Sequence, residues 1–186
     1  MTALKKSDIL LTPEEYLEGE LLSDVRHEYI GGRVFAMAGA SDDHNRISGN
    51  IFANLHAQLR GKPCEPFMND MKAKTPPAFY YPDVMVVCDP TDNHRYFRER
   101  PSVVFEVSSP DTEDIDRREK AMGFWYRPSC QSYIIVAQDR VALTVMTRGT
   151  GEWWDSEEIT DRSATLRLPE IGCEISVAEI YERTAV

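Results

Sequence analysis

The sequence predicts an α+β (mixed α/β) fold in which helices flank a central mixed β-sheet, and three observations favour this class. Helical and strand-like segments follow one another without a regular repeat. Two strand-like segments, 81–87 and 102–108, lack polar alternation apart from one carboxylate each, which is typical of central strands covered on both faces. The chain of 186 residues has the length of one ordinary domain, so we expect a single domain over residues 1–186.

The N-terminal part predicts a helix followed by a β-hairpin. Thr12 can cap a helix that begins at Pro13, and Glu15 stands where a capping box requires an acid. Two β-prone runs then meet at Gly31 and Gly32, which accept the positive φ angles of a tight turn.

A long helix is predicted from Asp43, and Gly61 and Pro63 end it. Its apolar residues recur every four positions, at Ile47, Ile51, Leu55 and Leu59. The segments after this helix are predicted as strands at 64–68, 71–74, 81–87 and 102–108, a helix at 111–126, strands at 131–137 and 141–148, and short strands with a small helix in 152–186.

Charge and composition exclude several classes of protein. The net charge of −10 argues against a general nucleic-acid binder, although it permits a local basic patch. No apolar run reaches the ~18 residues of a membrane helix and no signal peptide is apparent, so we expect a cytoplasmic protein without a membrane partner. The four cysteines lack metal-ligand spacing and are interpreted as buried reduced thiols: Cys64, Cys88, Cys130 and Cys173.

Two carboxylates stand out because each is a lone acid in an apolar strand, Asp83 in the first and Glu106 in the second. Neighbouring strands would bring them together, and close carboxylates repel unless a cation lies between them. One candidate cation is Mg²⁺, which accepts one or two protein carboxylates together with water and phosphate oxygens. The other is Lys120, which Asp116 could orient from one helical turn away, although an exposed salt bridge between these two residues is the plain alternative.

Three stretches of the chain resemble a known family: YPD, PSVVFEVSSPDTEDIDRREKAMGFWY and HEYIGGRVFAMAGASDDHNRISGNI. They are similar to the bacterial putative restriction endonuclease family of the PD-(D/E)XK nuclease superfamily over about residues 10–140. The resemblance implies a restriction-endonuclease-like core and a metal-dependent endonuclease that hydrolyses DNA phosphodiester bonds. Mg²⁺ is the implied cofactor, with Mn²⁺ as its substitute.

The same resemblance implies roles for individual residues. Glu28 would be an active-site acid, and Asp83 and Glu106 would bind the metal. The backbone carbonyl of Val107 would be a further metal ligand, and Lys120 the catalytic lysine.

The catalytic lysine departs from the commoner superfamily pattern, which places it two residues after the glutamate on the same face of the strand. That position is Ser108 here, and a lysine on the next helix is the usual substitute in the family.

Five basic residues are predicted to bind nucleic acid, with a solvated surface as the alternative. Three alternate with aromatic residues in the loop before residue 102, and two lie on one side of a strand expected beside that of Asp83. These residues are Arg95, Arg98, Arg100, Lys72 and Lys74. His44 and Asn45 are expected either to line the cleft or to cap the long helix.

Two other functions remain open from the sequence. The first is a catalytically inactive nuclease-fold protein that acts as a nucleic-acid-binding or assembly module, which the acidic net charge favours. The second is another metal-dependent hydrolysis. DNA is the expected partner, and a homodimer is an open alternative to a monomer.

Overall fold

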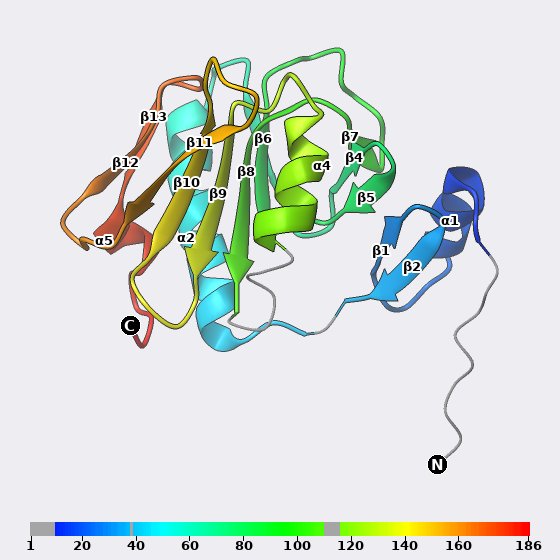
Figure 1. The fold of residues 1–186 in the computed structure, drawn as a ribbon. Coiled ribbons are helices and arrows are strands. Elements are labelled where there is room, and N and C mark those ends of the chain that lie inside the picture. The colour runs from blue at the N-terminus through cyan, green and yellow to red at the C-terminus, as the bar shows by residue number, and fades with distance from the viewer. Residues whose placement is uncertain (1–9, 38, 110–115) are drawn as a thin grey trace.

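A six-stranded mixed β-sheet forms the centre of the molecule (Figure 1). The computed structural model describes residues 10–37, 39–109 and 116–186. The strand order is β11-β10-β9-β8-β6-β3, and β8 and β9 pair in parallel while the other neighbours are antiparallel. The strands are β3 (Glu65–Met68), β6 (Val84–Val87), β8 (Pro101–Ser108), β9 (Ser132–Ala137), β10 (Leu143–Arg148) and β11 (Trp154–Ile159). The predicted mixed sheet is confirmed, and the two apolar strands are central in it.

The helix α2 (Asp42–Leu59) covers one face of this sheet (Figure 1). Its predicted apolar stripe is confirmed, because all four residues are at most 3% exposed and pack in one core with alternate residues of β6 and β8. The helix begins earlier than predicted because Ser41 is its cap, whose side chain accepts the N–H of His44 at 3.1 Å. Three further elements close this core: β12 (Thr165–Leu168), β13 (Cys173–Ser176) and α5 (Val177–Ile180).

The opposite face of the sheet is covered by α4 (Ala121–Trp125), which follows a π-helical turn, η1 (Asp116–Lys120). Phe124 is fully buried there against Tyr133 of β9, with their ring centroids 5.5 Å apart. The chain from β8 to β9 is thus a crossover between parallel strands. The cap predicted at residues 111–112 and the side chain of Asp116 lie outside what the structure describes.

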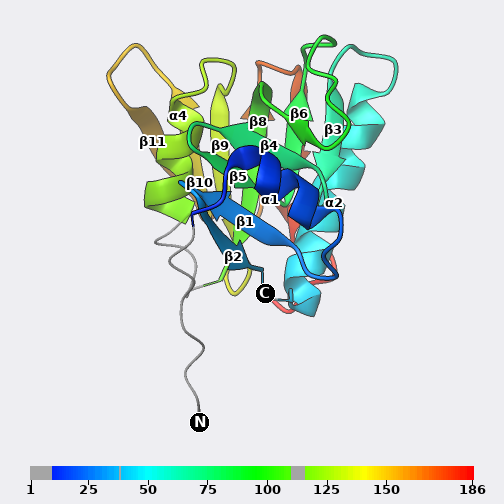
Figure 2. The same ribbon diagram turned by 90° about the vertical axis from the view of Figure 1, so that its right-hand side faces the viewer.

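A second sheet, of order β2-β1-β5-β4-β7, packs on the same side as α4. The helix α1 (Pro13–Glu20) covers its outer face (Figure 2), where Tyr16 stacks on Tyr29 with ring centroids 5.1 Å apart. The predicted capping box and the hairpin at Gly31–Gly32 are confirmed, with φ angles of +55° and +93° at the two glycines. The strands are β1 (His27–Ile30), β2 (Arg33–Ala36), β4 (Lys72–Thr75), β5 (Ala78–Tyr80) and β7 (Phe97–Arg98).

This second sheet corrects one prediction about strand order. The strand β4, which carries Lys72 and Lys74, pairs with β5 and β7 and not with the strand that follows Asp83. The neighbour of β6 on that side is β3. The arginine-rich loop also contains the short strand β7, which was expected to be irregular.

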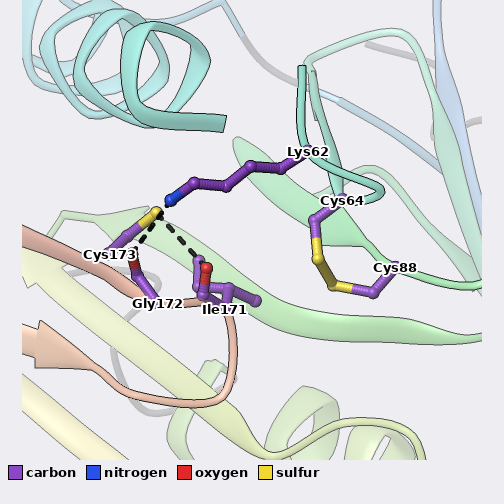
Figure 3. Close-up of a disulfide and its surroundings, with 6 residues drawn as sticks. All are labelled: Lys62, Cys64, Cys88, Ile171, Gly172 and Cys173. Carbon is purple, nitrogen blue, oxygen red and sulfur yellow. Dashed lines mark hydrogen bonds between the residues drawn. A yellow bond between two sulfur atoms is a disulfide. The ribbon is translucent and has the colours of Figure 1, made fainter. Parts of the chain in front are cut away.

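The cysteines differ from the prediction of four reduced thiols. Cys64 and Cys88 form a disulfide (Figure 3), whereas Cys130 and Cys173 are free and buried as expected. The disulfide follows from the antiparallel register, in which Glu65 faces Val87 and the two cysteines immediately outside this pair face each other. Within the described ranges, no helix is long and apolar enough to cross a membrane.

Candidate active site

Asp83 and Glu106 lie opposite each other on neighbouring strands. Val84 of β6 faces Phe105 of β8, and the next pair outward in this register is Asp83 with Glu106. Glu106 lies within β8, as predicted. Asp83 was expected inside a strand but immediately precedes Val84, the first residue of β6. The side chains of Asp83 and Glu106 are 14% and 4% exposed, so both carboxylates are largely removed from water.

Asp83 has two partners within the protein. Its Oδ2 accepts the backbone N–H of Val107 at 2.7 Å, and its Oδ1 lies 3.3 Å from Nε2 of His44. The first contact fixes the carboxylate against the strand that carries the second acid. The second contact shows that His44 points toward the site from the first turn of α2, while Ser41 has the capping role.

Lys120 lies between Glu28 and Glu106. Its Nζ is 3.0 Å from Oε1 of Glu28 and 3.5 Å from Oε2 of Glu106. The lysine is the last residue of the π-helical turn, a rare geometry that is frequent at functional sites. Lys120 is only 9% exposed, so its side chain does not lie on an exposed helix surface.

The formal charges of the described cleft residues do not balance. Four carboxylates line the cleft, Glu28, Asp70, Asp83 and Glu106, against the two cations Arg26 and Lys120, so negative charge is in excess. Like charges at short distance in a poorly solvated site repel strongly. A divalent cation bound beside these carboxylates would reduce that repulsion.

These residues line one cleft with a volume of about 620 Å³. The volume falls within the range of small-ligand sites, and the cleft runs between the β1–β2 hairpin, the start of α2 and the ends of β6 and β8. The residues predicted to be catalytic or metal-binding all line it: Glu28, Asp83, Glu106, Val107 and Lys120.

The donor atoms were compared with the needs of a metal ion. In the described ranges, no group of three His, Cys, Asp or Glu side chains is arranged to hold a metal. A hard divalent ion such as Mg²⁺ needs only one or two carboxylates, with water and substrate oxygens as its remaining ligands. Asp83 and Glu106 supply two, and the excess negative charge fits such an ion, so the residues present are compatible with Mg²⁺ or Mn²⁺.

A buried network supports the strand that carries Glu28. The hydroxyl of Tyr16 donates to the carbonyl of His27 at 2.7 Å, and the N–H of His27 donates to Glu20 at 2.8 Å. Tyr81 also donates its hydroxyl to Glu20, at 2.9 Å, while its own N–H lies 3.4 Å from Glu28. Burial raises the pKa of Tyr81, so its hydroxyl stays protonated and can donate its hydrogen bond to Glu20. The network links α1 to the wall of the cleft.

The two lysines predicted to bind nucleic acid lie outside the cleft lining. Lys72 is buried with its Nζ 5.0 Å from the centre of the Tyr81 ring, and burial lowers its pKa. Lys74 pairs with Glu99 at 2.7 Å. The prediction that both lie on one side of a strand agrees with their positions two residues apart in β4.

The three loop arginines also have partners within the protein. The guanidinium of Arg98 lies 4.5 Å from the centre of the Phe67 ring and donates to the carbonyls of His94 and Phe97. Arg100 pairs with Asp89 at 2.7 Å, and Arg95 stacks over Tyr96 at 5.4 Å. Their binding of nucleic acid stays a prediction.

Among the cleft residues missed from the sequence are Arg26 and Phe35. Arg26 precedes Glu28 by two residues, and Phe35 faces Glu28 across the hairpin. The period of two along a strand could have identified Arg26 once Glu28 was placed, whereas Phe35 required the hairpin register.

The fold and the cleft together define a nuclease-like protein of the restriction-endonuclease-like class. The crystal structure of a putative nuclease of Anabaena variabilis, assigned to the domain family DUF820, superposes with a TM-score of 0.75. The alignment covers 92% of this chain and 97% of that chain at 15% identity, a level that establishes the fold alone.

The chain belongs to the family described as "Putative restriction endonuclease" (Uma2), whose model matches residues 13–178. Two uncharacterized proteins of Synechocystis sp. (strain PCC 6803) are similar to it. The first is 34% identical, and the alignment covers 94% of this chain and 93% of the relative. The second is 33% identical, and the alignment covers 69% of this chain and 76% of the relative.

Proposed function

We propose that the protein is a metal-dependent endonuclease that hydrolyses phosphodiester bonds in DNA. The observation that carries this proposal is the position of Lys120 between Glu28 and Glu106, in the cleft where Asp83 faces Glu106. Family membership and the nuclease-like fold support the same class of reaction. In this proposal Asp83 and Glu106 hold Mg²⁺, together with the carbonyl of Val107.

Each group has a separate chemical role in this proposal. A divalent ion held by Asp83 and Glu106 would supply a Lewis acid for the scissile phosphate and would lower the pKa of a bound water. The ammonium of Lys120 orients the attacking water or stabilises the negative charge that develops on the phosphoryl oxygens. Glu28 holds that ammonium at 3.0 Å and so keeps its direction fixed. Asp83 is oriented in turn by the N–H of Val107.

The test uses the purified full chain with supercoiled plasmid in the presence of Mg²⁺, Mn²⁺ or EDTA. Conversion of supercoiled DNA to nicked or linear forms, lost with EDTA, is the expected result. Glu106→Gln is the matched control, because it keeps the shape of a side chain that is 4% exposed while removing its charge. A folded protein that leaves plasmid intact with either metal would instead indicate an inactive nucleic-acid-binding or assembly module.

A further inference from the structure

The β1–β2 hairpin presents one face to the cleft. Glu28 faces Phe35 in the hairpin register, and the N–H of Met37 donates to the carbonyl of Arg26 at 2.9 Å, which extends the pairing by one step. Directly opposed residues share a face of the sheet, as do residues two apart in a strand. Arg26, Glu28, Phe35 and Met37 therefore share one face, and all four line the cleft.

Phe35 is an exposed aromatic residue in a charged cleft. It is 44% exposed, whereas Tyr29 on the other face of the hairpin is 5% exposed and packs against Tyr16. Leaving an aromatic ring in water forgoes the stabilisation that burial would provide. The ring therefore remains accessible to a ligand bound in the cleft.

Arg26 is the second cation of the cleft among its described residues, beside Lys120. Its guanidinium pairs with Asp70 at 3.0 Å, and these two side chains are 46% and 87% exposed. An exposed ion pair contributes only about 0–1 kcal/mol, so Arg26 can exchange this carboxylate for a phosphate at little cost. The planar fork of a guanidinium also matches two phosphate oxygens.

We propose that this hairpin face binds a nucleotide whose base is unpaired, with Phe35 stacked on the base and Arg26 on a neighbouring phosphate. Bases inside a duplex stack on one another and present mainly their edges, so an aromatic ring stacks most readily on a base that is single-stranded or displaced. The two cations that line the same cleft, Arg26 and Lys120, complement the phosphates that flank such a base. The inference rests on the proposed function and narrows its substrate to DNA with unpaired bases.

The test measures binding separately from cleavage. Anisotropy of labelled single-stranded and duplex DNA of about 20 nucleotides is recorded in EDTA, a length that exceeds the site of a single-strand-binding domain. Phe35→Leu removes the ring but keeps an apolar side chain. Val34→Leu is the matched control, because Val34 is 43% exposed on the same strand but on the other face of the hairpin.

We expect the wild type to prefer the single strand and Phe35→Leu to bind it about 5- to 150-fold more weakly, the equivalent of ~1–3 kcal/mol for one base–aromatic stack. Phe35→Tyr and Val34→Leu should bind like the wild type. Arg26→Gln should reduce the slope of log affinity against log salt by about 0.7, the value for one lost phosphate contact on a single strand.

Unchanged single-strand binding by Phe35→Leu would overturn the inference. If that variant also changed from dimer to monomer in sedimentation, the ring would belong to an interface between two copies. The proposed function can fail independently of this inference. If binding depends on Phe35 but plasmid is not cleaved with either metal, the binding site is supported and the nuclease activity is contradicted. A wild type that binds no DNA would overturn both.

Discussion

Nζ of Lys120 lies 3.5 Å from a carboxylate oxygen of Glu106, although the lysine ends a helical turn and the glutamate lies inside β8. The commoner position of the superfamily lysine is occupied by Ser108, two residues after Glu106 on the same strand and 1% exposed. The helical turn that ends at Lys120 therefore places an ammonium beside Glu106, the same carboxylate that a lysine at position 108 of the strand would reach. The sequence alone could not establish this geometry, because the approach of a helix to a strand depends on tertiary packing.

Lys120→Met should abolish most cleavage while leaving Mn²⁺ binding intact. In the proposed mechanism the ammonium acts on water and phosphate, whereas the metal would contact carboxylates, so the two functions should separate. Calorimetry with Mn²⁺ and a plasmid assay on the same preparation measure both. Undiminished cleavage by this variant would remove Lys120 from the mechanism, and an unfolded variant is recognised by its far-ultraviolet circular dichroism.

Replacing Arg95 and Arg100 with Ala should weaken DNA binding and flatten its salt dependence by about one unit per lost phosphate contact. Within the part of the chain that the structure describes, the guanidinium of Arg100 forms a solvent-accessible pair with Asp89, so the substitution should cost little stability. Arg98 is left in place because it packs on Phe67. Anisotropy over a range of salt concentrations measures the slope, and an unchanged slope would assign the loop to the solvated surface.

Glu99→Gln should lower stability at neutral pH and have no effect in acid. The hydrogen bond from Lys74 lowers the pKa of Glu99 below its ordinary value of 4.5, so the stabilisation is present above that value and is lost as the pH falls through the lower folded pKa. Both side chains are more than one-third exposed, so the effect at pH 7 should stay below about 1 kcal/mol. Melting curves from pH 7 to about pH 3 measure the difference. If the difference in melting temperature between the wild type and Glu99→Gln persists in acid, the effect arises from packing and not from the ion pair.

Because Cys64 and Cys88 are joined, we expect a thiol reagent to modify two cysteines of the denatured protein without reductant, Cys130 and Cys173. After reduction it should modify all four cysteines. Reduction should also destabilise the fold by about 3 kcal/mol, since the bond closes a loop between cysteines 24 positions apart. A thiol count in denaturant checks the first statement. Four reactive thiols without reductant would restore the interpretation that all the cysteines are reduced.

Local features of this fold could be predicted from the sequence because each depends on a few neighbouring residues. The capping box at Thr12, the glycine turn of the hairpin and the stripe of α2 are all of this kind. The opposition of Asp83 and Glu106 was also anticipated, since two lone acids in apolar strands would share a cation or a partner.

Features that depend on the register between strands distant in the chain could not be predicted. The pairing of β4 with β5 and β7 and the facing of Cys64 by Cys88 each follow from which residues align across strands. A shift of one residue would turn every side chain of a strand to its other face, and composition does not record that choice.

The central claim is that Asp83 and Glu106 share a metal ion, and anomalous diffraction from a crystal soaked in Mn²⁺ tests it most directly. The account predicts a peak within coordination distance of one oxygen from each carboxylate, and loss of that peak in Asp83→Asn. If a crystal soaked at an Mn²⁺ concentration that supports cleavage shows no peak between the two carboxylates, the metal-site account is contradicted.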